Sequence, residues 1–170
     1  HGVFRRQRQM CIRDRLMAPL GVNIIGVNKK GQMVDGCSKI VTVDKIDSVL
    51  PDADFLYLAV PGTPETKNLI NRERLDKLKP TCGIVNIGRQ SVMDYDVLCE
   101  KLKKNEIAGA ILDVFTPEPI EKNSKLWNTP NLFITPHVSS DELNNYIELT
   151  LNIFVKNLNL FLEIKELNKK

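Results

Sequence analysis

The chain has 170 residues, of which 42% are apolar and 26% are charged, and these proportions exclude disordered and collagen-like proteins in favour of a globular one. No apolar run reaches the roughly 18 residues of a membrane-spanning helix, which indicates a soluble protein with no membrane partner. The net charge is +3, but residues 1–15 carry five arginines against one aspartate, so the rest is nearly neutral and does not suggest a nucleic-acid partner.

Short apolar runs alternate with helical patterns along the chain. In chain order, the patterns predict a strand over 22–27, a helix over 43–50, a strand over 54–60, a helix over 71–78, a strand over 83–87, a helix over 94–104, a strand over 107–114, a loop over 117–130, a strand over 131–135 and a long amphipathic helix over 141–166. Apolar strands alternating with helices are typical of a parallel sheet buried on both faces. We therefore predict an α/β, doubly wound fold.

The four cysteines, at positions 11, 37, 82 and 99, form no CxxC pair and have irregular spacing. They predict neither a zinc site nor a disulfide framework. We expect no bound metal, and small buried thiols in a reducing compartment such as the cytoplasm.

Ligands of doubly wound folds bind at the carboxyl ends of the strands, so the residues there deserve most weight. Those with useful chemistry are Arg89, Asp113, Glu118 and His137. Arginine can hold a carboxylate in a bidentate fork, and histidine can exchange a proton near neutral pH. A carboxylate beside the histidine orients the ring and favours its charged form. We interpret Arg89, Glu118 and His137 as a catalytic set; the alternative is that each is an ordinary surface or loop residue.

Four stretches of the sequence resemble the cofactor-binding domain of the D-isomer-specific 2-hydroxyacid dehydrogenases. They are ADFLYLAVPGTPETKNLIN (53–71), LKPTCGIVNIGRQSV (78–92), IAGAILDVFTPEP (107–119) and LWNTPNLFITPHVSS (126–140). The resemblance implies a Rossmann-like fold, a nicotinamide cofactor, and hydride transfer between that cofactor and a 2-keto or 2-hydroxy acid. It implies further that the complete enzyme is a homodimer.

The resemblance also implies residue roles. Arg89 would bind the substrate carboxylate, His137 would act as acid and base, and Glu118 would pair with the histidine. Asp113 would contact the nicotinamide carboxamide. Glutamine at position 90 stands where the family usually has glycine, which removes no functional group.

Other residues would bind the adenosine half of the cofactor. By resemblance, Pro61 and Thr66 line that side. Asn28, Lys29 and Lys30 follow the first predicted strand, where NAD-preferring folds place an acid for the ribose 2′-hydroxyl. Because two lysines stand there instead and could neutralise a 2′-phosphate, we favour NADP over NAD; the alternative is a solvated lysine turn.

The sequence has no GxGxxG motif, which the family uses to bring backbone N–H groups onto the pyrophosphate. Family-like sequence begins near Leu16, so we expect the fold to lack its first strand and glycine loop. Residues 1–15 resemble a translated sequencing adapter and are expected to be a non-native leader, a basic native arm being the alternative. Residues 16–140 would be a partial dinucleotide-binding domain, and 141–170 a C-terminal helix returning to a missing substrate domain. We expect such a fragment to be marginally stable and inactive.

A function of a different class is a non-catalytic, NAD(H)-gated interaction module like the corepressors that resemble this family. The intact set of Arg89, Glu118 and His137 favours the oxidoreductase. A relative acting on formate or phosphite is a second alternative.

Overall fold

The computed structural model describes residues 21–139, together with 151–152, 154–157 and 159. The predicted leader, residues 1–15, lies outside the described residues, and so does most of the helix predicted over 141–166. The residues of that helix that the structure does describe, 151–152, 154–157 and 159, are helical. The chain divides into two units, His1–His137 and Val138–Lys170, and the candidate site lies in the first. The described part of the chain contains no helix with the length and apolar character that crossing a membrane requires.

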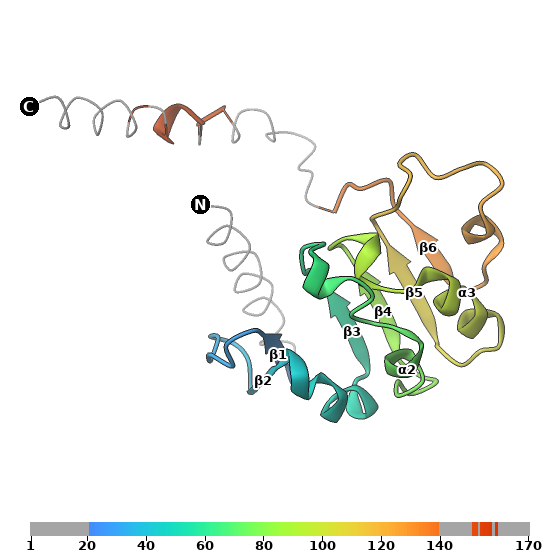
Figure 1. Cartoon of the computed structure of the whole chain (residues 1–170), viewed down its shortest axis with the longest axis horizontal. Helices are drawn as coiled ribbons and strands as arrows, with labels where there is room; N and C mark the ends of the chain where they lie inside the picture. The colour runs from blue at the N-terminus through green and yellow to red at the C-terminus, as the bar shows by residue number, and fades with distance from the viewer. Residues whose placement is uncertain (1–20, 140–150, 153, 158, 160–170) are drawn as a thin grey trace, which may run out of the picture. The chain divides into compact units, whose positions relative to one another are not determined.

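Six short strands in the described residues form two sheets, in which every pair is parallel (Figure 1). The smaller sheet pairs β1 (Ile25–Asn28) with β2 (Lys39–Thr42). The larger has the order β3-β4-β5-β6, formed by β3 (Phe55–Leu58), β4 (Gly83–Asn86), β5 (Gly109–Leu112) and β6 (Leu132–Ile134). Parallel strands joined by helical crossovers confirm the α/β class.

The helices are short. Between residues 21 and 137, the α-helices are α2 (Arg72–Leu75) and α3 (Tyr95–Lys103). The 3₁₀ helices are η2 (Val43–Ser48), η3 (Leu50–Asp52), η4 (Pro64–Thr66), η5 (Gln90–Val92) and η6 (Lys125–Asn128). Helix α3 begins where the side chain of Asp94 accepts hydrogen bonds from the backbone N–H groups of Asp96 and Val97, which satisfies donors that the first turn leaves unpaired.

Several predicted elements differ from the structure. Strand β2 was not predicted, because its sequence KIVT is short and has a polar residue at each end. The helix predicted over 43–50 is 3₁₀ rather than α, and the loop predicted over 117–130 contains η6. The described strands form two separate sheets, with no pairing between β1 and β3.

The core lies between one face of the larger sheet and helices α2 and α3 (Figure 1). Leu58, Ile84 and Leu112 project from the strands, and each is at most 5% exposed. Leu75 of α2 and Leu98 of α3, each at most 1% exposed, meet them. Burying each such side chain contributes about 1.5–3 kcal/mol, so this layer holds the strand ends in fixed positions.

The other face of the larger sheet is apolar, and several of its described side chains are exposed. Tyr57, Val85, Ile111 and Phe133 are aligned by register on adjacent strands and therefore share that face. Ile111 is 44% exposed, Phe133 is 69% exposed, and Phe55, two residues before Tyr57, is 76% exposed. Helices α2 and α3, the α-helices described between residues 21 and 139, pack on the opposite face.

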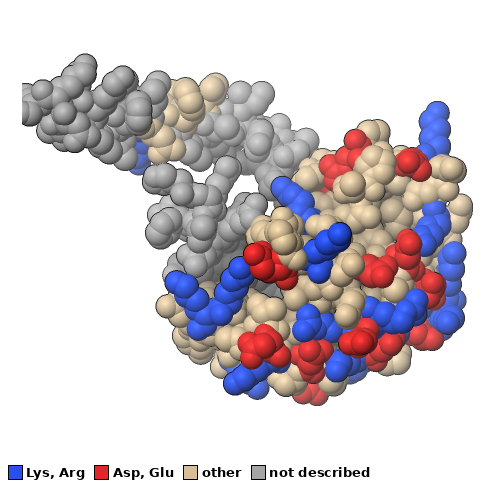
Figure 2. All heavy atoms as spheres, in the orientation of Figure 1, with Lys and Arg blue, Asp and Glu red and all other residues tan. Residues whose placement is uncertain are grey.

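The helical side of the molecule carries charges of both signs. Figure 2 shows lysines and arginines interspersed with acidic residues over this surface. Arg72 pairs with Glu100 at 2.7 Å, and Lys101 pairs with Asp76 at 2.7 Å, so the two bridges connect α2 and its C-cap to α3. The mixture agrees with the nearly neutral charge of residues 16–170.

Replacing Phe55 and Phe133 together with threonine is expected to reduce self-association of the chain while changing the free energy of unfolding by no more than about 0.5 kcal/mol. Threonine keeps the strand preference and removes two exposed rings. Light scattering after size-exclusion chromatography measures the association. As a control, Leu98→Thr on the buried face should destabilise by about 2–4 kcal/mol and should not reduce association. Equal association of the double variant and the unaltered chain would contradict the prediction.

Candidate active site

The three predicted catalytic residues follow three neighbouring strands. β4, β5 and β6 end in register, so the loops that leave them start side by side at one edge of the sheet. Arg89 lies in the loop after β4, Glu118 in the loop after β5, and His137 in the segment after β6. The parallel topology therefore brings segments that are distant in sequence to one edge.

Glu118 and His137 are in direct contact. The Oε2 atom of Glu118 lies 2.9 Å from Nδ1 of His137, and Oε1 accepts a hydrogen bond of 2.7 Å from the backbone N–H of Phe115. A carboxylate can only accept, so Nδ1 of the ring carries the hydrogen and Nε2 is the atom left to exchange a proton. His137 has a φ of +58°, a left-handed backbone that is uncommon outside glycine and recurs at functional sites.

The carboxylate of Glu118 is stabilised in its charged form. Its pKa lies below the ordinary value, first because of the hydrogen bond with His137 and then because of the N–H of Phe115, with the positive charge of Arg89 contributing as well. Arg89 is thus near enough to interact electrostatically with the pair. The pair is half-exposed, so a substrate can reach the ring.

Close backbone packing holds the loop that carries Arg89. The arginine precedes η5 with an extended backbone, and its Nη1 donates to the carbonyl of Gly88 at 2.7 Å. A Cβ atom at Gly88 would lie 2.5 Å from the carbonyl oxygen of Val60, so a side chain there would force the backbone to shift. A Cβ at Gly62 would lie 3.3 Å from Cβ and Cγ of Arg89. The arginine stem therefore lies against the loop that follows β3.

Asp113 is buried at the end of β5. It is 1% exposed, and its Oδ1 accepts a hydrogen bond of 2.6 Å from the hydroxyl of Thr135. Its backbone N–H donates to the carbonyl of Asn86 at 3.0 Å. The carboxylate therefore connects the end of β5 to the segment that leads to His137.

Pro61 and Thr66, predicted on the adenosine side, belong to one closed loop after β3. The hydroxyl of Thr66 donates to the carbonyl of Pro61 at 2.6 Å and accepts from the backbone N–H of Thr63 at 2.8 Å. The bond from Thr63 to Thr66 is one half of a capping box at the start of η4, in which the Thr63 side chain also accepts from the backbone N–H of Thr66. The Thr66 hydroxyl thus maintains the shape of the loop.

Asn28, Lys29 and Lys30 form the turn after β1. The side chain of Asn28 closes it by accepting a hydrogen bond of 3.0 Å from the backbone N–H of Lys30. Both lysine side chains are exposed. The pKa of Glu65 is lowered chiefly by its hydrogen bond from Thr63, and the positive charge of Lys29 contributes. The lysine turn is therefore electrostatically coupled to the loop after β3.

Two buried polar residues that support the site were not predicted from the sequence. The side-chain amide of Asn86, 0% exposed, donates to the carbonyl of Arg89 at 3.1 Å and to the hydroxyl of Tyr95 at 3.0 Å, and its oxygen accepts from the N–H of Gly88 at 3.0 Å. Tyr95 in turn donates to the carbonyl of Val114 at 2.9 Å. Burial raises the pKa of this hydroxyl, so it remains a neutral donor. The one available signal was an asparagine within the apolar run GIVNI.

Comparison with known proteins agrees with this architecture. The profile of the family described as "D-isomer specific 2-hydroxyacid dehydrogenase, NAD binding domain" matches residues 13–139. Glyoxylate/hydroxypyruvate reductase B of Pectobacterium carotovorum is 46% identical over 95 residues, which are 56% of this chain and 30% of the relative.

Solved structures agree as well. A D-isomer specific 2-hydroxyacid dehydrogenase family protein from Aeromonas salmonicida superposes with a TM-score of 0.82 at 29% identity, covering 88% of this chain and 47% of that one. The NADPH-dependent glyoxylate/hydroxypyruvate reductase of Sinorhizobium meliloti, solved with NADP and sulfate, has a TM-score of 0.78 at 27% identity, covering 89% of this chain and 48% of that one.

The chain spans less than half of the curated relatives it matches, 48% of one from Corynebacterium melassecola and 30% of the Pectobacterium reductase. The family match nevertheless includes all six strands and the three loops that carry Arg89, Glu118 and His137. The chain therefore belongs to the D-isomer specific 2-hydroxyacid dehydrogenase family and contains sequence of its NAD-binding domain.

Proposed function

We propose that the protein to which this chain belongs is an oxidoreductase that transfers a hydride between a nicotinamide cofactor and a 2-keto or 2-hydroxy acid. The observation that carries the proposal is the 2.9 Å contact between Glu118 and His137 beside Arg89. Together these residues offer a cation for a substrate carboxylate and a ring nitrogen for proton exchange.

Each residue has a distinct task in the proposed reaction. Arg89 binds the carboxylate of the keto acid and polarises the neighbouring carbonyl. Glu118 fixes the ring of His137 through Nδ1 and stabilises positive charge on it, so that Nε2 delivers a proton to the carbonyl oxygen during reduction. The cofactor, when bound, supplies or accepts the hydride.

The residues present fit the nicotinamide end of such a cofactor. Asp113 has a buried carboxylate at the end of β5, the strand next to the one that His137 follows. That carboxylate would accept a hydrogen bond from the carboxamide N–H of the nicotinamide. The loop that holds Pro61 and Thr66 would line the adenosine side. We favour NADP, because the turn over 28–30 has two lysines and no acid, and because the Sinorhizobium reductase at a TM-score of 0.78 was solved with NADP.

The names of the relatives suggest short keto acids as substrates. The Pectobacterium and Sinorhizobium proteins are glyoxylate/hydroxypyruvate reductases. Both named compounds have a carboxylate next to a carbonyl, which is the pair of groups that Arg89 and His137 would recognise. We further propose that the complete enzyme acts in the cytoplasm as a homodimer.

The test is glyoxylate- or hydroxypyruvate-dependent oxidation of NADPH, followed by its absorbance, in a protein that also contains the part of the relatives that this chain does not span. Turnover with either acid supports the proposal. The Pectobacterium and Sinorhizobium relatives are reductases and the Aeromonas relative is a dehydrogenase family protein, so the comparisons give no support to the corepressor-like alternative. If the complete protein bound the cofactor tightly but turned over neither acid, that result would contradict the oxidoreductase proposal and favour the corepressor-like alternative.

Replacing Lys29 and Lys30 together with alanine is expected to raise KM for NADPH about tenfold or more, equivalent to about 1.4 kcal/mol, and to leave KM for NADH nearly unchanged. The reason is that only NADPH has the 2′-phosphate that the two lysines would neutralise. Steady-state kinetics with both cofactors measures the effect. Lys39→Ala, at the opposite end of the smaller sheet, is the matched control. A strong preference of the unaltered enzyme for NADH would contradict the assignment.

A further inference from the structure

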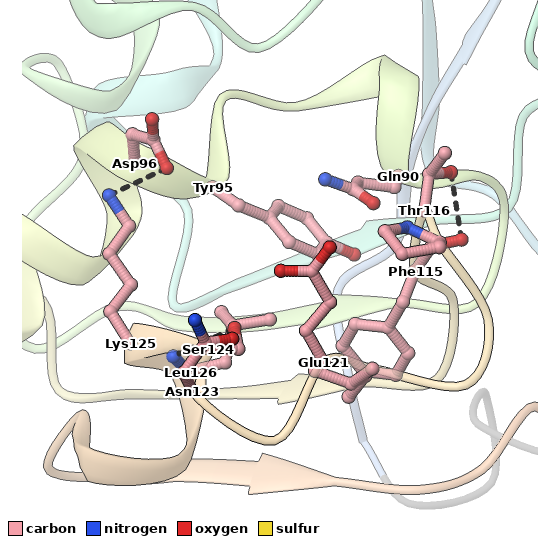
Figure 3. A pocket seen from close by; sticks show the side chains of 12 residues that line it. Gln90, Tyr95, Asp96, Phe115, Thr116, Glu121, Asn123, Ser124, Lys125 and Leu126 are labelled. Atoms are coloured by element: carbon pink, nitrogen blue, oxygen red, sulfur yellow. Dashed lines mark hydrogen bonds and ion pairs between the residues drawn. The ribbon is translucent and has the colours of Figure 1, made fainter.

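A pocket of about 390 Å³ lies beside the candidate active site, among the residues that follow β4 and β5 and the first turn of α3 (Figure 3). Its lining includes Gln90, which directly follows Arg89, and Pro117, which directly precedes Glu118. None of the lining residues has a role in the reaction proposed for Arg89, Glu118 and His137. The pocket is therefore a separate feature of the same edge of the sheet.

One polar atom of the lining lacks a partner. The side-chain oxygen of Gln90 is buried and has no hydrogen bond within the described structure. Leaving a buried acceptor unsatisfied costs about 1–3 kcal/mol, so a donor that reached it would bind favourably. Figure 3 shows the Gln90 amide close to the ring of Tyr95, among the lining side chains.

The charges of the lining favour a cation. Lys125 is paired with Asp96 at 2.6 Å, so these two cancel each other. Glu121 has no ion-pair partner within the described structure, which leaves one carboxylate among the lining groups. An acceptor and a carboxylate in one pocket suit a ligand that donates through several N–H groups.

The remaining lining is apolar and aromatic. Tyr95 and Phe115 are 5% and 8% exposed, and their rings meet edge to face with centroids 6.2 Å apart. Leu126 is 9% exposed. Such a floor suits an aliphatic stem, and aromatic rings attract a nearby cation.

We propose that this pocket binds a small organic cation, an alkyl guanidinium or alkyl ammonium group, whose N–H groups bond to Gln90 and Glu121 while its stem packs on Tyr95 and Leu126. This binding does not depend on the proposed dehydrogenase activity.

The chain contains its own reporter for this binding. Trp127 is its single tryptophan, and its indole N–H donates to the backbone carbonyl of Glu121 at 2.9 Å. A ligand held by Glu121 should therefore change the fluorescence of Trp127. The measurement needs neither cofactor nor turnover, so its failure and a failure of the proposed reaction can be told apart.

The experiment titrates the 170-residue chain with n-butylguanidinium and follows Trp127 emission. Saturable binding is expected, whereas n-butanol and butyrate at equal concentrations should give none. Glu121→Gln and Gln90→Met should each raise Kd about tenfold. Glu73→Gln, an exposed position on α2 outside the pocket, is the matched control and should bind like the unaltered chain. Far-UV circular dichroism verifies that each variant is folded.

Three results would overturn the proposal. One is the lack of saturation up to about 20 mM of the cation, a range in which weak ligands are still detected. Another is equal binding of butanol or butyrate, which would mean that the pocket recognises only the apolar stem or prefers an anion. The third is an unchanged Kd in both Glu121→Gln and Gln90→Met.

Discussion

Replacing His137 with asparagine is expected to lower kcat/KM for keto-acid reduction by about 10²–10⁴-fold, the usual contribution of a positioned general acid or base. Asparagine is the sharpest choice because His137 has a φ of +58°, and asparagine tolerates this left-handed backbone better than alanine does. The substitution therefore removes the titrating ring with little added strain. The measurement is steady-state reduction of glyoxylate or hydroxypyruvate by the complete enzyme.

The control for this prediction is Glu118→Gln. Glutamine can still accept a hydrogen bond from the ring but no longer stabilises positive charge on it, so we expect a smaller loss than for His137→Asn. Both variants should retain the melting temperature of the unaltered enzyme within a few degrees, since the pair is half-exposed. Activity of His137→Asn within a few-fold of the unaltered enzyme would exclude His137 as the acid and base.

The sequence predicted the parts of the fold that depend on local pattern. The apolar runs that became β3 to β6 and the amphipathic pattern of α3 were strong enough to identify, apart from their ends. Strand β2 was missed because KIVT gains its strand character from pairing with β1, a tertiary contact that local pattern does not record. The exposure of Phe133 was not predicted for a related reason, because an apolar run does not tell which of its side chains a helix covers.

The site was predictable only in part. Arg89, Glu118 and His137 could be proposed because each follows a strand and because the family resemblance assigns their roles. Asn86 and Tyr95 could not, since one ends a strand and the other begins a helix nine residues later, and only packing brings their side chains together. The unsatisfied oxygen of Gln90 likewise depends on where its loop lies against α3. Local sequence therefore indicates which groups can do chemistry but not which groups hold them in place.

Replacing Asn86 with leucine, a side chain of similar size, is expected to lower the free energy of unfolding by about 3–5 kcal/mol. The asparagine is 0% exposed, and leucine would leave the N–H of Gly88 and the carbonyl of Arg89 without their side-chain partner. It would also remove a donor to the hydroxyl of Tyr95. Urea unfolding followed by circular dichroism measures the loss. Asn128→Leu, at an exposed position of η6, is the matched control and should change stability by no more than about 0.5 kcal/mol.

A double-mutant cycle tests whether Asn86 and Tyr95 act as one network. Tyr95→Phe removes only the hydroxyl that donates to Val114, so it should cost about 1–2 kcal/mol by itself. Because the two side chains are hydrogen-bonded at 3.0 Å, the cost of the double variant should fall short of the sum of the single costs by about 0.5 kcal/mol or more. Strict additivity would mean that the two bonds stabilise their loops independently. A loss below about 1 kcal/mol for Asn86→Leu alone would mean that this amide does not hold the Arg89 loop in place.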